Sequence, residues 1–129
     1  MIDFARDGRL WTATIARPEK ANSLTSEMLE ALAGFAGEAA REARVLVLTG
    51  QGKVFSAGAD LDEARAGLAT SPLWERLSGT LAAAPILTIA ALNGTLAGGA
   101  FSIGDLSEGL HSVGVFHAEY DVTRMDGFE

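Results

Sequence analysis

The alternation of apolar and polar residues predicts a β-hairpin at the start of the chain. Apolar side chains at positions 11, 13 and 15 alternate with threonines at 12 and 14, and the turn sequence Asp7-Gly8-Arg9 precedes them. We therefore expect two antiparallel strands, over residues 2–7 and 10–15. The polar composition of residues 17–23 then predicts a loop.

An amphipathic helix is expected after this loop. Thr25 or Ser26 can cap its first turn, which carries Glu27. From Met28 to Ala43, apolar residues recur at every third or fourth position, which is the spacing of one helix face. This is the strongest helical pattern in the sequence.

Two later segments share one plan. Residues 45–48 and 86–92 are short apolar runs typical of strands buried on both faces. Each is followed by a glycine-containing loop and by the expected start of a helix, directly after Gly58 in the first case and over 96–101 in the second. A further helix over about 73–84 ends before a proline. This order of elements predicts an α/β fold.

Length, charge and cysteine content exclude several classes of protein. The chain has 129 residues, of which 48% are apolar, enough for one compact domain and too few for two. A net charge of -7 repels phosphate backbones and anionic lipids, so we expect no nucleic-acid partner. Without cysteine there is no disulfide or thiolate metal site, and without an apolar leader at the N-terminus we predict a cytoplasmic location.

An uncharged stretch between Arg76 and Asp105 is long enough to cross a bilayer. It contains Pro85 and several glycines, and it has no aromatic anchors at its ends. A buried strand and helix explain it better, so we expect no membrane partner.

The composition changes after Gly104, which divides the chain into a core over 1–104 and an atypical tail over 105–129. The tail holds six acidic residues and one arginine. Val113, Val115, Phe116 and Tyr120 are compatible with one short strand. His111, His117, Glu119 and Asp121 carry potential metal-binding groups, but nothing in their spacing fixes a site, so we predict no metal.

Two short motifs are better explained by structure than by chemistry. The segment over 49–53 contains Gly50 and Gly52 but lacks both the third glycine of the dinucleotide fingerprint and the Gly-Lys-Ser/Thr of the P-loop, so a plain turn is favoured. Ser56 is not within a Gly-x-Ser-x-Gly elbow, and no histidine is near it in sequence. Nucleophilic serine catalysis is therefore not expected.

Ala59 and Gly99 are the strongest candidates for chemistry. Each is placed where a small-residue loop enters a helix, and each can present an unpaired backbone N–H. Two such donors aimed at one point would form an oxyanion hole, which stabilises negative charge on a thioester oxygen. Close packing of glycines explains the same residues equally well from spacing alone.

Three ordered segments of this chain resemble the signatures of the crotonase superfamily, the enoyl-CoA hydratases and isomerases. They are residues 17–24, 54–61 and 91–101. The resemblance implies a crotonase-like spiral of ββα units. It also implies binding of acyl-CoA thioesters, with coenzyme A as part of the substrate and no separate cofactor, and assembly into homo-oligomers, either trimers or paired trimers.

The resemblance also implies roles for individual residues. Ala59 and Gly99 would supply the catalytic oxyanion-hole N–H groups. The residues implied to line the substrate pocket are Lys20, Ala21, Ser23, Leu24, Ala57, Asp60 and Leu61.

The chain departs from the family pattern after Phe101. Ser102 stands where the hydratases have a catalytic glutamate, and the tail has no Pro-Glu pair to mark the second one, so Glu119 receives no role. The family normally continues for more than a hundred further residues. We therefore expect a truncated spiral, through a frameshift near codon 102 or as a short relative, with little or no hydratase activity and a tendency to self-associate. The alternative is a non-catalytic fragment for acyl-CoA binding or oligomerisation.

Overall fold

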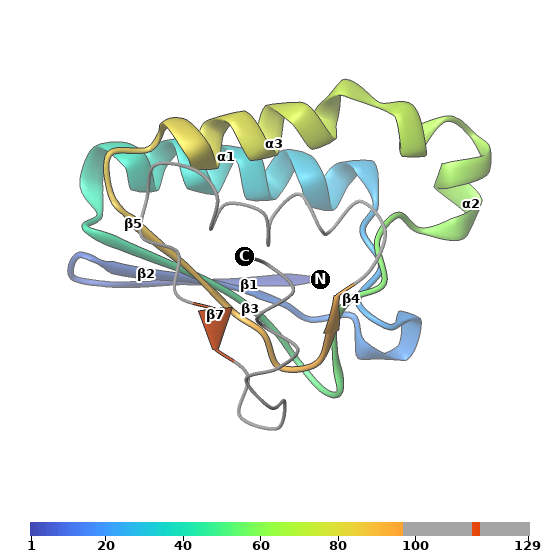
Figure 1. Cartoon of the computed structure of the whole chain (residues 1–129), viewed down its shortest axis with the longest axis horizontal. Helices are drawn as coiled ribbons and strands as arrows, with labels where there is room; N and C mark the ends of the chain where they lie inside the picture. Colours follow the sequence, from blue (N-terminus) through green and yellow to red (C-terminus); the bar gives the residue numbers. More distant parts are fainter. Residues whose placement is uncertain (97–114, 117–129) are drawn as a thin grey trace.

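A five-stranded sheet with two long helices on one face forms most of the structure (Figure 1). The structure is a computed structural model that describes residues 1–96 and 115–116. The strand order is β1-β2-β3-β5-β7. The bounds are Ile2–Asp7 for β1, Leu10–Ile15 for β2, Val45–Gly50 for β3, Leu87–Ala91 for β5 and Val115–Phe116 for β7.

The predicted hairpin is confirmed. β1 and β2 are antiparallel, and Gly8 takes the turn at a φ of 59°. The next pairs of the sheet are parallel instead: β2 pairs with β3, and β3 pairs with β5. Parallel neighbours need a long crossover, and here each crossover contains a helix.

These crossover helices are α1 (Ser26–Glu42) and α3 (Pro72–Ala83), which lie side by side over the sheet (Figure 1). Thr25 caps α1 as expected: its Oγ1 accepts from the Met28 N–H at 3.2 Å. The apolar face of α1 is buried, and Trp74, Leu77 and Leu81 of α3 join it in the core. Capping and periodicity therefore predicted α1 correctly, and the proline after its end marked α3 to within a residue.

The prediction that 45–48 is buried on both faces is only partly right. Leu46 and Leu48 are buried beneath the helices, whereas Val45 and Val47 on the opposite face are half-buried. In the part of the chain that the structure describes, α1 and α3 cover a single face of the sheet.

A second, two-stranded sheet forms from the segments that follow the two predicted buried strands. β4 (Val54–Ser56) follows β3, β6 (Thr95–Leu96) follows β5, and the two short strands pair in parallel. The helix predicted to begin at Leu96 is wrong at that residue, because pairing with β4 places it in a strand. Residues 97–101 of that prediction lie outside the described part.

The uncharged stretch folds as the last part of α3, then β5 and β6, as far as the structure describes it. No helix among the described residues is long and apolar enough to cross a membrane. At positions 115–116 of the tail the predicted short strand is confirmed as β7, parallel to β5. The domain boundary at 104 and the four potential metal ligands of the tail lie outside the described residues.

Candidate functional site

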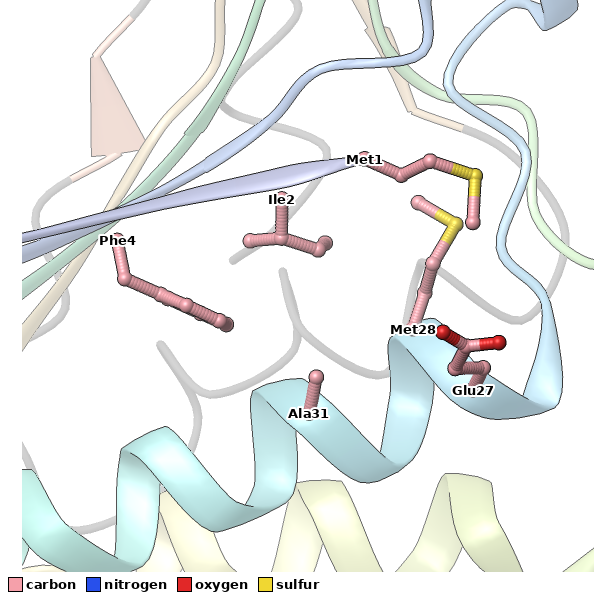
Figure 2. Close-up of a pocket in the computed structure, with 6 residues that line it drawn as sticks. All are labelled: Met1, Ile2, Phe4, Glu27, Met28 and Ala31. Carbon is pink, nitrogen blue, oxygen red and sulfur yellow. The ribbon is translucent and has the colours of Figure 1, made fainter.

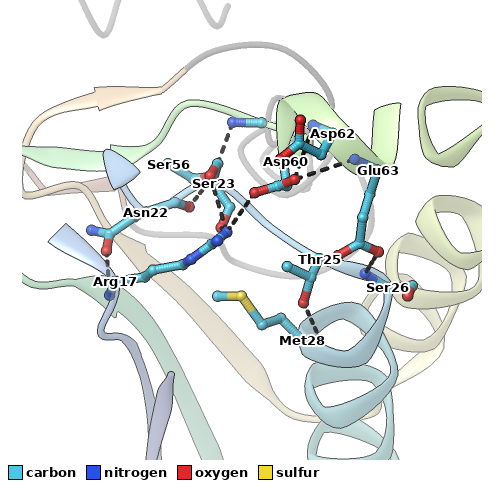
Figure 3. Close-up of polar contacts among 11 residues, drawn as sticks. Arg17, Asn22, Ser23, Thr25, Ser26, Met28, Ser56, Asp60, Asp62 and Glu63 are labelled. Carbon is cyan, nitrogen blue, oxygen red and sulfur yellow. Dashed lines mark hydrogen bonds and ion pairs between the residues drawn. The ribbon is translucent and has the colours of Figure 1, made fainter. Parts of the chain in front are cut away.

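Two loops that are far apart in sequence run side by side beyond the ends of β2 and β4 (Figure 3). A parallel bridge joins Leu24 to Ala59. In this bridge the Leu24 N–H donates to the Gly58 carbonyl at 2.7 Å, and the Asp60 N–H donates to the Leu24 carbonyl at 2.8 Å. The Ala57 N–H also donates to the Ala21 carbonyl at 3.0 Å. Backbone bonds therefore hold the two loops in register.

A cavity of about 420 Å³ lies between these loops, within the usual size range of small-molecule sites. Its lining residues are Lys20, Ala21, Ser23, Ala57, Ala59, Asp60, Leu61, Asp62 and Arg65. The structure thus brings most of the predicted site residues around one space. Leu24 is fully buried behind the lining, and Gly99 lies outside the described residues. Sequence reasoning missed Asp62 and Arg65, which follow on the same short helix.

The Ala59 amide is a free donor within the described part of the chain. Because a peptide group is planar and trans, its C=O and N–H point in opposite directions. The Gly58 carbonyl points to Leu24, so the Ala59 N–H points away from that loop. None of the described residues accepts a hydrogen bond from it. Ala59 is also one of the residues that line the cavity.

Asn22 is the main support of the first loop, although no pattern in the sequence singled it out. Its side chain is fully buried. The Oδ1 atom accepts from the Arg17 N–H at 2.8 Å, and the Nδ2 atom donates to the carbonyls of Gln51 and Val54 at 2.9 and 2.7 Å. Asn22 has a φ of 54°, a left-handed conformation that asparagine tolerates better than most residues.

Asp60 supports the pocket instead of presenting its carboxylate to it. One oxygen accepts from Arg17 Nη1 at 2.9 Å, and both side chains are largely buried. The other oxygen caps α2 (Leu61–Arg65) by accepting from the N–H groups of Asp62 and Glu63. The Glu63 N–H and the Arg17 guanidinium lower the pKa of Asp60, so its charge persists throughout the neutral range. We infer that the implied substrate role of Asp60 is indirect.

Glu63 ties the pocket to the first long helix (Figure 3). Its Oε1 atom accepts from the Ser26 N–H at 2.9 Å, in the first turn of α1. The same turn is capped by Thr25. The short helix that lines the pocket therefore rests on a well-packed part of the core.

Two motifs of the sequence, the segment over 49–53 and Ser56, make structural contacts. The segment after Gly50 is a turn whose carbonyls receive amide groups from Asn22 and Asn93. Ser56 is buried, and its hydroxyl donates to the Asn22 carbonyl at 2.9 Å. Among the residues that the structure describes, no group of histidine, aspartate or glutamate side chains could hold a metal ion.

A second, smaller cavity lies between β1 and α1 (Figure 2). Its volume is about 170 Å³, and its lining residues are Met1, Ile2, Phe4, Glu27, Met28 and Ala31. It includes no residue of the two site loops. Five of its six lining side chains are apolar, and Glu27 is the one charged side chain among them.

Comparison with known proteins gives consistent matches. The family described as enoyl-CoA hydratase/isomerase matches residues 6–106. A probable enoyl-CoA hydratase echA6 from Mycobacterium leprae is 38% identical over 104 residues, covering 76% of this chain and 42% of the relative. A probable enoyl-CoA hydratase from Rhodobacter capsulatus is 38% identical over 90 residues, covering 66% of this chain and 35% of the relative. The chain thus spans about two fifths of the length of the curated relatives that it matches.

Solved structures agree with this result. The structure of DspI from Pseudomonas aeruginosa has a TM-score of 0.71 and 30% identity, covering 81% of this chain and 46% of that one. An enoyl-CoA hydratase from Mycobacterium avium subsp. paratuberculosis has a TM-score of 0.75 and 26% identity, covering 90% and 48%. The fold predicted from the sequence is therefore confirmed as the fold of these proteins.

Proposed function

The chain belongs to the enoyl-CoA hydratase/isomerase family, and from this premise we propose that it binds acyl-CoA thioesters in the pocket between the two loops. The observation that carries the proposal is Ala59, which lines the pocket and whose N–H has no acceptor among the described residues. In this proposal the Ala59 N–H donates a hydrogen bond to the carbonyl oxygen of the thioester. Gly99 is proposed as the second donor, by resemblance.

This geometry supports chemistry that builds negative charge on the thioester oxygen. Removal of an α proton, or addition of water to the neighbouring double bond, passes through an enolate whose charge lies on that oxygen. A fixed backbone N–H stabilises this charge better than water does, because it needs no reorientation during the reaction. One such donor is typically worth about 2.7 to 4 kcal/mol of the barrier.

The rest of the pocket suits the nucleotide part of coenzyme A. Lys20 and Arg65 line it and place positive charge where phosphate groups can bind. Leu61, a residue that is 73% exposed, also lines the pocket and offers an apolar surface against which an adenine ring can pack. The lining thus combines two cationic side chains with the apolar surface of Leu61, and one of these cations, Arg65, is also ion-paired with Asp62 at 3.7 Å.

Hydration itself is proposed to be slow. The two family glutamates transfer protons, and Ser102 occupies the position of the first. Serine cannot replace a carboxylate as a general acid or base at neutral pH. The sequence therefore favours binding and polarisation of a thioester over its efficient turnover, which keeps a non-catalytic acyl-CoA-binding role as the second candidate function.

Calorimetric titration with two matched ligands tests the proposal. Butyryl-CoA carries the thioester carbonyl, and S-butyl-CoA is a thioether of the same chain length without it. One net hydrogen bond of about 1 kcal/mol predicts that butyryl-CoA binds roughly fivefold more tightly. Equal dissociation constants for the two ligands, or no binding of either, would contradict the proposal.

A further inference from the structure

The backbone at Gly58 is fixed by hydrogen bonds on both sides. The carbonyl of Gly58 accepts from the Leu24 N–H at 2.7 Å, and the N–H of Gly58 donates to Ser56 Oγ at 3.1 Å. Gly58 has a φ of 96°, in a region that side-chain-bearing residues rarely adopt. The two peptide groups that flank this glycine are therefore each held by one bond.

These bonds matter because glycine is the most freely rotating residue of the chain. The Ala59 N–H belongs to the same rigid peptide group as the Gly58 carbonyl. Rotation about the Gly58 backbone would turn this group and aim the Ala59 N–H elsewhere. The direction of the proposed donor consequently depends on what restrains Gly58.

Ser56 is placed to provide one of these restraints. It is the last residue of β4 and is fully buried. Its hydroxyl accepts from the Gly58 N–H and donates to the Asn22 carbonyl at 2.9 Å (Figure 3). Asn22 is itself held by three side-chain bonds to the backbone. One hydroxyl thus connects the most firmly supported residue of the first loop to the turn that precedes Ala59.

We infer that Ser56 is a positioning residue, whose hydroxyl fixes the direction of the Ala59 N–H and so the strength with which a thioester carbonyl is polarised. This inference rests on the proposed function of Ala59. A nucleophilic role does not fit, because the serine proton is donated to a backbone carbonyl and the serine side chain is fully buried.

Ser56→Ala is the direct test, and the chain offers a matched control in Ser71→Ala. Ser71 Oγ accepts from the Leu73 N–H, also two residues ahead and also at 3.1 Å, but it caps α3 and has no bond to the pocket loops. The full chain would be bound to butyryl-CoA labelled with ¹³C at the carbonyl. Difference infrared spectroscopy then gives the carbonyl stretching frequency, which falls as the hydrogen bond to the oxygen strengthens.

We expect Ser56→Ala to lose more than half of the downward frequency shift that the wild type shows, and to weaken butyryl-CoA binding several-fold while leaving S-butyl-CoA binding nearly unchanged. Ser71→Ala should keep the full shift, because the Ser71 hydroxyl is bonded to the first turn of α3 and not to the pocket loops. Ser56→Cys has a similar volume with weaker hydrogen bonds and should show an intermediate shift, which secures the test should Ser56→Ala fold poorly.

A wild-type shift retained in full by Ser56→Ala, or by Ser56→Cys where the alanine variant does not fold, would overturn the positioning role and leave the proposed function standing. Absence of any shift in the wild-type complex would instead overturn the proposed function itself. The two failures are therefore distinguishable in the same experiment.

Discussion

Replacing Gly94 with alanine should cost the chain most of its stability. A Cβ atom at this position would overlap the Lys53 carbonyl and lie 3.0 Å from the Val54 nitrogen. Both are main-chain atoms, Lys53 directly before β4 and Val54 its first residue, so moving them would disturb the pairing of Val54 with Thr95 of β6. Overpacking usually costs about 1 to 3 kcal/mol, and a clash with immovable backbone should exceed about 3 kcal/mol. Urea unfolding followed by circular dichroism measures this loss.

Gly34→Ala is the matched control for this substitution. Gly34 lies within α1, and a Cβ atom there would contact nothing within 4 Å. Alanine is the better helix former, so this variant should gain about 1 kcal/mol. If the Gly94→Ala protein unfolds at the same urea concentration as the wild type, Gly94 does not lie as close to the Lys53 carbonyl as described.

Asn22→Ala is expected to have the second largest effect, a loss of about 3 to 5 kcal/mol of unfolding free energy. The substitution leaves the Arg17 N–H and the Gln51 carbonyl without their partner at two part-buried bonds, and each such loss costs about 1 to 3 kcal/mol. Alanine is also less stable than asparagine at a φ of 54°. Chemical denaturation of the two proteins at neutral pH gives the difference.

Asn93→Ala serves as the comparison. Asn93 also donates to the Val54 carbonyl, at 3.1 Å, and to the Gly52 carbonyl at an exposed site. Its removal leaves Val54 bonded to Asn22, so we expect a loss of only about 1 kcal/mol. Equal losses for the two variants would show that Asn22 is not the principal support of the loop.

Elements set by local sequence could be predicted well. The hairpin around Gly8 and the Thr25-capped helix follow from turn chemistry, capping and periodicity, which all act over a few residues. Leu96 was assigned to a helix because its own surroundings resemble a helix start. Its strand conformation depends on β4, about forty residues earlier, and no local pattern reports such pairing.

The candidate site, too, depends on contacts between residues that are far apart in sequence. That the loops over 20–24 and 57–61 share a pocket came from the family resemblance, since spacing alone gave no contact between them. The supports of that pocket join residues 34 to 43 positions apart, as in the Ser56 to Asn22 and Arg17 to Asp60 bonds. Asp60 was implied to bind substrate, yet its oxygens are engaged within the fold. Three expectations stay predictions: the role of Gly99 as a hydrogen-bond donor, assembly into homo-oligomers and the cytoplasmic location.

The NMR signal of the Ala59 amide proton reports directly whether this amide donates a hydrogen bond to a bound thioester. ¹H–¹⁵N spectra of the chain would be recorded during titration with butyryl-CoA and, in parallel, with S-butyl-CoA. We expect a downfield shift of the Ala59 amide proton that saturates with butyryl-CoA and is much smaller with the thioether. An Ala59 proton that moves equally with both ligands, or with neither at saturation, would contradict this expectation.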